Sequence, residues 1–329
     1  LGTGIEQGGA GALVVQAGGS IDLGTTAGIK SYGNFLNTGL PVKGSDLVVV
    51  AGIGRPVGPA DAEAFFGSVD SAGNATPGSL VEAGLAYSAL KAEGKPDEAQ
   101  KKIDDARTGI IVPFLGNPVT SEGADINMVS SQIGTNSGKD GIYVIASGTV
   151  NGGKSSIVLD RATAQSRLNS TGIYTAKGGG IDIFSGGDLN VNEARVMTFQ
   201  GGDILAWSDR KSVNAGRGSR TAISAQPPKL VRQGSDPNSP LVLVFSPPAV
   251  GSGIRTLTYA AGFADVAPEA GNVYLFAPSG DIDAGEAGIA GSRVILGAIH
   301  VLNAANISFT SGSVGVPAIA GTGFHFDTV

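Results

Sequence analysis

The sequence predicts an all-β protein, a parallel β-helix (solenoid) with an inserted helical hairpin. Glycine is abundant, with 53 residues among 329, and it is accompanied by many valine, isoleucine and leucine residues. Charged residues are scarce at 15%, against about 25% in an ordinary globular chain. Glycine-led segments with alternating apolar positions recur along the chain, and a period of roughly 20 residues is typical of stacked solenoids.

The repeated segment consists of a short alternating strand, a corner of small residues and a second short strand. Copies start at Gly11, Gly141, Gly180, Gly202, Gly271 and Gly291. Neighbouring starts are 22 residues apart from 180 to 202 and 20 residues apart from 271 to 291. A leucine lattice and the three-and-four spacing of helical repeats are both missing. The alternation therefore favours coils whose strands pair in parallel with their copies in the next coil.

Inward positions of such coils would stack into one continuous aliphatic core. The expected core residues are Ile181, Ile183, Leu189, Val191, Ile204, Val213, Val273, Leu275 and Ile282. Glycine suits the corners because it adopts a positive φ without strain. Asparagine at the strand ends tolerates the same conformation and can bond to its own backbone or to a neighbouring asparagine. The residues in question are Asn190, Asn192, Asn214 and Asn303.

The expected organisation follows the chain in five parts. β-Helix coils are expected at 1–53, 116–223 and 251–329, and the last of these ends in a terminal cap. Residues 54–115 are expected to form a helical insertion. Residues 224–250 are expected to form a Pro-rich loop with one strand, Leu241–Phe245. The chain begins inside the repeat pattern, so we expect a longer protein around it. Because the open ends of a β-helix must be covered, we expect the insertion or the tail Gly315–Val329 to shield an end or an edge.

The insertion is identified by helix signals that the coils lack. A short helix is expected at Asp61–Phe66. Ser79–Glu82 has the spacing of a capping box, and an apolar face runs from there toward Gly94, a suitable stop. Pro96 suits the first turn of a second helix, and Gly109 suits its end. We expect the hairpin to pack on the side or on the end of the solenoid.

Composition also excludes several classes of protein. The net charge is −6 and there is no basic stripe, so no nucleic-acid partner is expected. The sequence has no cysteine, which excludes disulfides and thiolate metal sites. No apolar run of about 18 residues suggests a membrane span. Neither a cofactor nor a metal is predicted.

The two histidines, His300 and His325, are isolated in sequence, so neither a Ser-His-Asp arrangement nor a zinc site can be argued from them. No catalytic residue is predicted.

Carboxylates are the residues through which a β-helix of this kind would cut polysaccharide. Asp182, Asp188 and Asp203 fall on neighbouring coils, and Asp281 and Asp283 share a strand. The alternatives are a solvated outer face, turn caps or a calcium site, although neither the glycine-rich calcium repeat nor the EF-hand spacing is matched. We expect the outer face or turn caps.

A modest basic cluster is the candidate for glycan contact. It consists of Arg210, Lys211, Arg217 and Arg220, in an otherwise acidic chain. Trp207 is the only tryptophan. If its ring points outward it is a platform on which a sugar can stack, and if it points inward it belongs to the core.

Several runs of the sequence resemble a known family. They are GGDILAWSDRKSVNAGRGSRTAISAQPP, GSGIRTL, GNVYLFAPSGDIDAGEAGIAGSRVILGAIHVLNAANI and SVGVPA, preceded by AEAFFGSVDSAG and INMVSSQIGTNSG. They resemble filamentous-haemagglutinin-type outer-membrane proteins of Gram-negative bacteria, in particular the C-terminal region of two-partner secretion exoproteins. The resemblance covers roughly residues 45 to 318. These motifs are specific to the fold and identify no catalytic residue.

The resemblance implies a right-handed β-helix and export through an outer-membrane two-partner secretion transporter, by way of sequence outside this fragment. It implies a cell-surface or extracellular location and a role in adhesion or biofilm matrix. The partners would be a surface glycan, an exopolysaccharide, a receptor protein or further copies of the chain. The alternative is a polysaccharide-active β-helix enzyme, a lyase or glycoside hydrolase. Because no acid and base groups converge in the sequence, we expect no enzyme.

Overall fold

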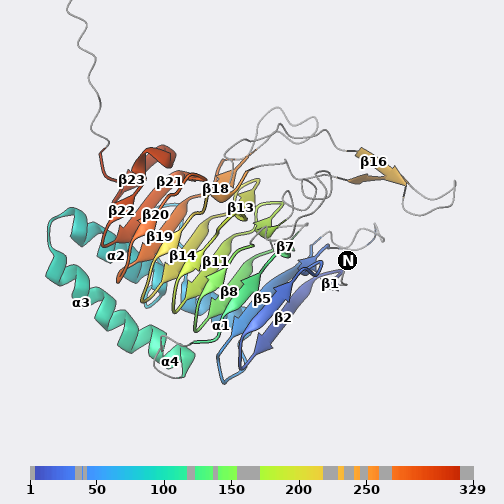
Figure 1. Cartoon of the computed structure of the whole chain (residues 1–329), viewed down its shortest axis with the longest axis horizontal. Coiled ribbons are helices and arrows are strands. Elements are labelled where there is room, and N and C mark those ends of the chain that lie inside the picture. The colour runs from blue at the N-terminus through green and yellow to red at the C-terminus, as the bar shows by residue number, and fades with distance from the viewer. Residues whose placement is uncertain are drawn as a thin grey trace, which may run out of the picture.

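The protein is a parallel β-helix with helices along one flank (Figure 1), which confirms the predicted fold class. The structure, a computed structural model, describes residues 4–33, 39, 43–116, 123–135, 140–153, 171–217, 229–232, 241–244, 251–258 and 269–318. Among these residues, no helix is long and apolar enough to cross a membrane.

Successive coils contribute one strand to each of three faces. The first face contains β1 (Ile5–Gln7), β4 (Ile29–Ser31), β7 (Gln132–Thr135), β10 (Gly172–Thr175), β13 (Arg195–Phe199) and β18 (Gly253–Leu257). The second face contains β2 (Gly11–Ala17), β5 (Ser45–Ala51), β8 (Ile142–Ala146), β11 (Ile181–Ser185), β14 (Ile204–Ser208) and β19 (Val273–Ala277). The third face contains β3 (Ile21–Gly24), β6 (Ile126–Met128), β9 (Val150–Asn151), β12 (Leu189–Asn190), β15 (Val213–Asn214), β20 (Ile282–Asp283) and β22 (Val301–Leu302).

The last coils join the first two faces. The long strand β21 (Ile289–Ala298) pairs with β18 through its first residues and with β19 through Val294–Ala298. A 3-10 turn, η2 (Ala304–Asn306), leads into β23 (Ile307–Val314), which pairs with β21. One continuous sheet therefore covers two sides of the solenoid.

The register between coils places apolar residues of one coil beside apolar residues of the next. Ile183, for example, pairs with Val144 in the preceding coil and with Ala206 in the next. Each of the nine predicted core residues is at most 1% exposed, and all belong to one cluster that runs through the coils. The core prediction is confirmed.

From β5 to β19 the second face is largely apolar on both sides, because most of its outward residues face helices instead of water. Its strands read as continuous apolar runs, such as ILAWS in β14, which is the pattern of a parallel sheet covered on both faces. The outward residues form a second buried cluster with the helices, including Val50, Phe184, Trp207 and Phe276.

The helical insert (residues 54–115) leaves the coils after β5. It contains α1 (Pro59–Phe66), α2 (Leu80–Ala92) and α3 (Pro96–Ala106). The Oγ of Ser79 accepts a hydrogen bond from the backbone N–H of Glu82 at 3.4 Å, as the capping-box spacing predicts. Gly94 follows α2 with a φ of 74°.

Gly109 does not end the second helix of the hairpin. The chain continues through a π-helical turn, η1 (Arg107–Ile111), and a last turn, α4 (Val112–Leu115), to Gly116 with a φ of 75°. Residues beyond Gly109 remain helical because Ile111 and Phe114 are buried against the second face and α1, where the rings of Phe114 and Phe65 stack with centroids 3.9 Å apart.

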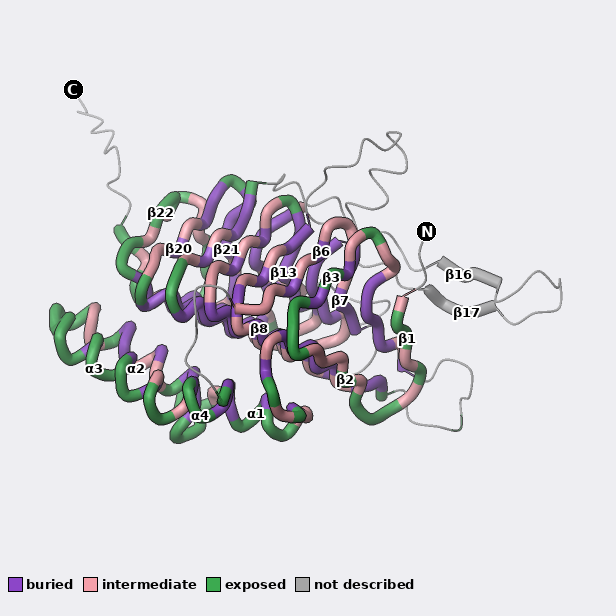
Figure 2. Tube along the Cα trace, turned by 60° about the horizontal axis from the view of Figure 1, so that its bottom comes forward, coloured by how far each residue is buried: buried purple, intermediate pink, exposed green. Residues whose placement is uncertain are grey.

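The insert packs on the side of the solenoid, over the outward surface of the second face (Figure 2). It does not lie over an end of the stack. Gly84 of α2 lets the helix approach closely, since a Cβ there would lie 2.4 Å from the ring of Phe276. Gly297 of β21 also allows this close approach, because a Cβ there would lie 2.6 Å from the Ser88 side chain of α2.

The Pro-rich segment holds more regular structure than predicted. Instead of one strand at Leu241–Phe245, it has β17 (Leu241–Val244) paired antiparallel with β16 (Lys229–Arg232). The alternation in KLVR is too short to separate from loop sequence, so the partner strand was missed. The predicted cap at the C-terminus lies largely outside the described residues, which end at 318.

Corners use glycine and asparagine as expected. Asn192 and Asn303 have φ values of 56° and 54°. Gly216 combines a φ of 96° with close backbone approach, because a Cβ would lie 1.8 Å from the carbonyl oxygen of Asn192. Only glycine fits such a corner.

Candidate functional site

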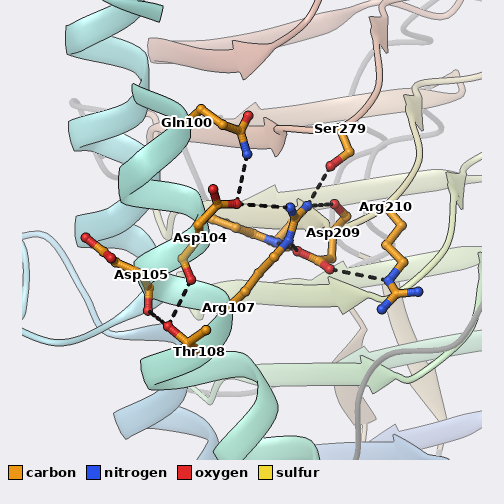
Figure 3. Close-up of polar contacts among 9 residues, drawn as sticks. Gln100, Asp104, Asp105, Arg107, Thr108, Asp209, Arg210 and Ser279 are labelled. Carbon is orange, nitrogen blue, oxygen red and sulfur yellow. Dashed lines mark hydrogen bonds and ion pairs between the residues drawn. The ribbon is translucent and has the colours of Figure 1, made fainter. Parts of the chain in front are cut away.

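A cluster of polar side chains joins the insert to the coils (Figure 3). Arg107, in the π-helical turn, donates from Nε to Asp209 Oδ1 at 3.0 Å and from a terminal nitrogen to the Asp209 carbonyl oxygen at 2.7 Å. The same nitrogen donates to Ser279 Oγ at 2.5 Å. Asp209 follows β14 and Ser279 follows β19, so one guanidinium holds the corners of two neighbouring coils.

Local structure explains why Arg107 and Asp209 meet. Asp209 is 1% exposed, and its backbone N–H bonds to Ser185 of the preceding coil at 2.9 Å. The π-helical turn shifts the helix face, and such turns are frequent at functional positions. Asp104 supports the turn through a 3.7 Å ion pair with Arg107, and Thr108 donates to the Asp104 carbonyl oxygen at 3.0 Å. The cluster acts as an anchor for the insert.

Trp207 is fully buried, with an exposed fraction of 0%. Its ring points away from the aliphatic core yet is covered by the insert, with the Phe276 ring 5.7 Å away. Its Nε1 lies 3.5 Å from Asp209 Oδ1, at the limit of a hydrogen bond. No ring face is open to a sugar, so Trp207 is not a stacking platform. Sequence alone could not foresee a side chain that points outward and is buried by an insertion.

Of the four predicted basic residues, the structure describes three, and these three do not form one patch. Arg210 and Lys211 are exposed at the corner between β14 and β15, where they pair with Asp209 at 3.9 Å and with Asp188 at 3.6 Å. Arg217 is exposed on the other side of β15. Arg220 lies outside the described residues. The structure therefore brings together only the first two.

Two of the predicted carboxylates lie on neighbouring coils at the second face, and one of them, Asp182, interacts with Glu63 of the insert. Asp182 is the outward residue of β11 between Tyr143 and Leu205, and Asp203 precedes β14. Burial raises the pKa of Asp182 well above its usual value, and the nearby carboxylates of Asp203 and Glu63 raise it further. Burial also raises the pKa of Asp203, against hydrogen bonds from Asn272 that lower it. Asp203 Oδ1 accepts the Asn272 backbone N–H at 2.7 Å.

The other predicted carboxylates act as caps, Asp188 and Asp281 between neighbouring coils and Asp283 within its own turn. Asp188 Oδ1 accepts the backbone N–H of Ser212 at 3.0 Å, and Asp281 Oδ1 accepts that of His300 at 3.2 Å. Asp283 Oδ1 accepts the N–H of Gly285 at 2.8 Å. The prediction of turn caps is therefore correct for these residues.

Histidine and metal chemistry find no support among the described residues. His300 Nδ1 lies 2.8 Å from Asp281 Oδ1, and both side chains are exposed. His325 lies outside the described residues. In the described part of the chain, no group of three or more histidine, aspartate or glutamate side chains is placed to hold a metal ion.

The anchor at Arg107 was missed by the sequence analysis. Nothing in the spacing of Arg107 and Asp209, which are 102 residues apart, marks them as partners. The one local signal is a charged residue directly after the apolar run ILAWS, at a corner where the strands β5, β8, β11 and β19 are followed by glycine, serine or proline.

Residues 201–318 match a family model described as "Filamentous haemagglutinin family outer membrane protein". This range begins just before β14 and includes Asp209, Ser279 and the last coils. The predicted resemblance is confirmed over these residues, and the description points to an outer-membrane or surface protein. Among curated proteins and solved structures, none matches the chain.

Proposed function

We propose, from the premise that residues 201–318 are those of a filamentous haemagglutinin-type surface protein, that this chain is an adhesive or structural module. In this proposal it is a rigid β-helical rod that holds binding surfaces away from the cell. The observation that carries the proposal is the stack of coils in register around a buried aliphatic core.

Rigidity follows from the packing. Inward side chains are close to fully buried in every central coil, and neighbouring coils are joined by ladders of backbone hydrogen bonds. The insert braces the stack from outside, because α1 packs near β5 and α2 contacts β21. Such a rod bends little, so it suits a spacer or a presenting surface.

The proposed partners follow from the same premise. Export would use an outer-membrane two-partner secretion transporter that recognises sequence outside this fragment. At the cell surface, the module would contact surface glycan, exopolysaccharide, a receptor protein or further copies of itself. Contact of glycan with Arg210, Lys211, Arg217 and Arg220 remains a prediction.

A binding screen tests the proposal. The full chain would be measured against a glycan array, the producing cell's own exopolysaccharide and whole cells, with heat-unfolded chain as the control. Saturable binding to at least one of these is expected. If no ligand binds and the chain stays monomeric at high concentration, an adhesive role is contradicted. The module would then act only as a spacer.

The enzyme alternative draws on one observation, the pair Asp182 and Asp203 on neighbouring coils with raised pKa values. A raised pKa suits a general acid. We expect no turnover, because the insert packs over this part of the second face. Incubation with a polysaccharide panel checks this: new reducing ends or unsaturated products that disappear in Asp182→Asn would overturn the non-enzymatic assignment.

A further inference from the structure

The first and the last coil of the β-helix each present an edge to which no described strand is paired. On one side the edge consists of β1 and β2 of the large sheet and β3 of the smaller one, and on the other side of β22 and β23. Figure 1 shows β2 and β23 at opposite ends of the stack. The strand β2 reads GALVVQA, without the charge or proline that often protects an edge strand from pairing with another chain.

Exposed large apolar side chains gather on the first coil (residues 5–24) and on the last (residues 299–314). Within the part of the chain that the structure describes, the exposed ones are Ile5, Val14, Val112, Ile299, Leu302 and Phe309. All of them except Val112 belong to these two coils. The core residues Leu13 and Val15 of the first coil, and Val301 and Ile307 of the last, are only partly buried. The aliphatic core is therefore open at both ends.

Glycines at two corners of the coils make room for the backbone of the preceding coil. A Cβ on Gly271, before the second face, would lie 1.8 Å from a backbone oxygen of that coil, and a Cβ on Gly280, before the third face, would lie 2.2 Å from another. The register between coils gives Gly11 and Gly19 the same two positions in the first coil. A Cβ on either of these would meet nothing within 4 Å. The first coil thus has the clearance that accepts a further parallel coil, and the described residues place none there.

We propose that copies of this chain stack head to tail. The last coil of one copy docks on the first coil of the next, and their strands pair in parallel, as neighbouring coils do within one chain. The inference rests on the proposed adhesive or structural function, and it selects a second copy of the chain as the partner. Such a contact joins two different surfaces and does not close on itself, so repeated contacts produce a filament.

Rows of core residues continue across the proposed contact. The row through the first face begins at Ile5 and ends at Ile307. The row through the third face begins at Ile21 and ends at Val301. Head-to-tail stacking places aliphatic groups of the two copies side by side in both rows, at the strand spacing of about 4.8 Å. Removing these partly exposed groups from water stabilises the contact.

The second face favours the contact on its outer side. In its inner row Leu13 would follow Ser313, so that row gains little. In its outer row Val14 would follow Val314, which packs against the cluster formed with the insert. The helix α2 also contacts β23, so the insert of one copy reaches the coil on which the next copy docks. The same insert would then cover Val14, which is 42% exposed in the single chain.

Sedimentation velocity of the full chain over a range of concentrations tests the inference. We expect the sedimentation coefficient of wild type to rise with concentration. Gly19→Leu places a side chain in the clearance that the next copy would fill, and it meets nothing within the single chain. This variant should weaken association at least about tenfold with an unchanged Tm. Gly109→Leu is the matched control, because a Cβ there also meets nothing within 4 Å and the residue lies on the insert, so it should associate as wild type does.

A mixing experiment tests the direction of stacking. Phe309→Lys adds a charge to the edge of the last coil, at a side chain that is 43% exposed. At a concentration where wild type associates, this variant and Gly19→Leu should each be monomeric alone and should form dimers, and nothing larger, when mixed. The inference is overturned if wild type stays monomeric, if Gly19→Leu associates as strongly as wild type, or if either variant dimerises alone. If a monomeric chain still binds cells or exopolysaccharide, only this inference fails and the adhesive function stands.

Discussion

A carboxyl group sits in an otherwise apolar line of side chains on the second face. The outward positions in register are Val48, Tyr143, Asp182, Leu205 and Tyr274, so four of these five carry a large apolar or aromatic group. Burial and two neighbouring carboxylates raise the pKa of Asp182 in the folded protein. The unfolded chain has the ordinary aspartate pKa, so folding takes up a proton at this site.

This proton uptake predicts a pH dependence of stability. The contribution of Asp182 is fully present below the unfolded pKa of about 3.9, and it is lost as pH rises through the folded pKa. Asp182→Asn should therefore raise the free energy of unfolding at neutral pH, by about 1 to 3 kcal/mol. Urea denaturation at several pH values measures the free energy of unfolding of both proteins. The stability that the variant gains over wild type should shrink toward acidic pH. A gain that is independent of pH would contradict the assignment.

Arg107 is the residue whose loss should most weaken attachment of the insert. Arg107→Ala removes the partner of a buried carboxylate, that of Asp209. We expect it to lower the free energy of unfolding by about 3 kcal/mol. Arg107→Ala combined with Asp209→Asn should recover part of that loss, since no unpaired buried charge remains. Thermal unfolding measures both, and Lys101→Ala, an exposed change on α3, is the control. Equal Tm values for Arg107→Ala and the control would refute the anchor.

At the scale of one helix, packing overrides propensity. An alanine in place of glycine inside an exposed helix adds about 1 kcal/mol of stability. Gly84→Ala should instead destabilise, because its Cβ would lie 2.4 Å from the Phe276 ring and push α2 off the sheet. Gly109→Ala is the matched control, because nothing lies within 4 Å of a Cβ there, and it should be neutral or stabilising. Chemical denaturation should show a lower free energy of unfolding for Gly84→Ala and an unchanged or higher one for Gly109→Ala. Changes of the same sign in both variants would contradict the packing.

The insert as a unit shields an aromatic surface. Deleting residues 54–115 would expose outward residues of the second face such as Phe184, Trp207 and Phe276. We expect the shortened chain to aggregate and to bind a hydrophobic dye, because exposed apolar patches of this kind associate. Light scattering measures this outcome. A soluble, monomeric deletion variant would show that the coils need no cover on this side.

The sequence allowed the elements to be predicted better than their contacts. Period-two alternation and glycine corners placed the strands, and Ser79, Gly94 and Pro96 placed the helix boundaries, because these signals are local. The continuation past Gly109 depends on burial of Ile111 by distant residues, which no local pattern carries. The same reason explains Trp207 and Arg107: Trp207 is covered by residues of the insert, and Arg107 pairs with a residue 102 positions away in sequence.

Considered as a whole molecule, the β-helix is a one-dimensional stack in which each coil contacts its neighbours and the insert adds longer ties. Lys91 Nζ donates to the carbonyl oxygen of Ala298 at 2.6 Å and so links α2 to the last residue of β21. Terminal coils of a stack open more easily than central ones. We expect hydrogen exchange to be slowest in β11 and β14, and Lys91→Ala to speed exchange in β21 selectively. Uniform acceleration across all coils would indicate global destabilisation instead.

The path of the insert along the solenoid also limits how this protein can change in length. The insert contacts β8 through the Phe66 and Tyr143 rings, and it reaches β21 through Lys91. A duplicated coil between these two points would lengthen the stack by about 4.8 Å, whereas a helix advances about 1.5 Å per residue. Because the hairpin runs out along the stack and returns to α1, growth by repeat duplication would require about three extra residues in each of its two arms for every added coil. The length of the helices therefore limits the number of coils that they can cover.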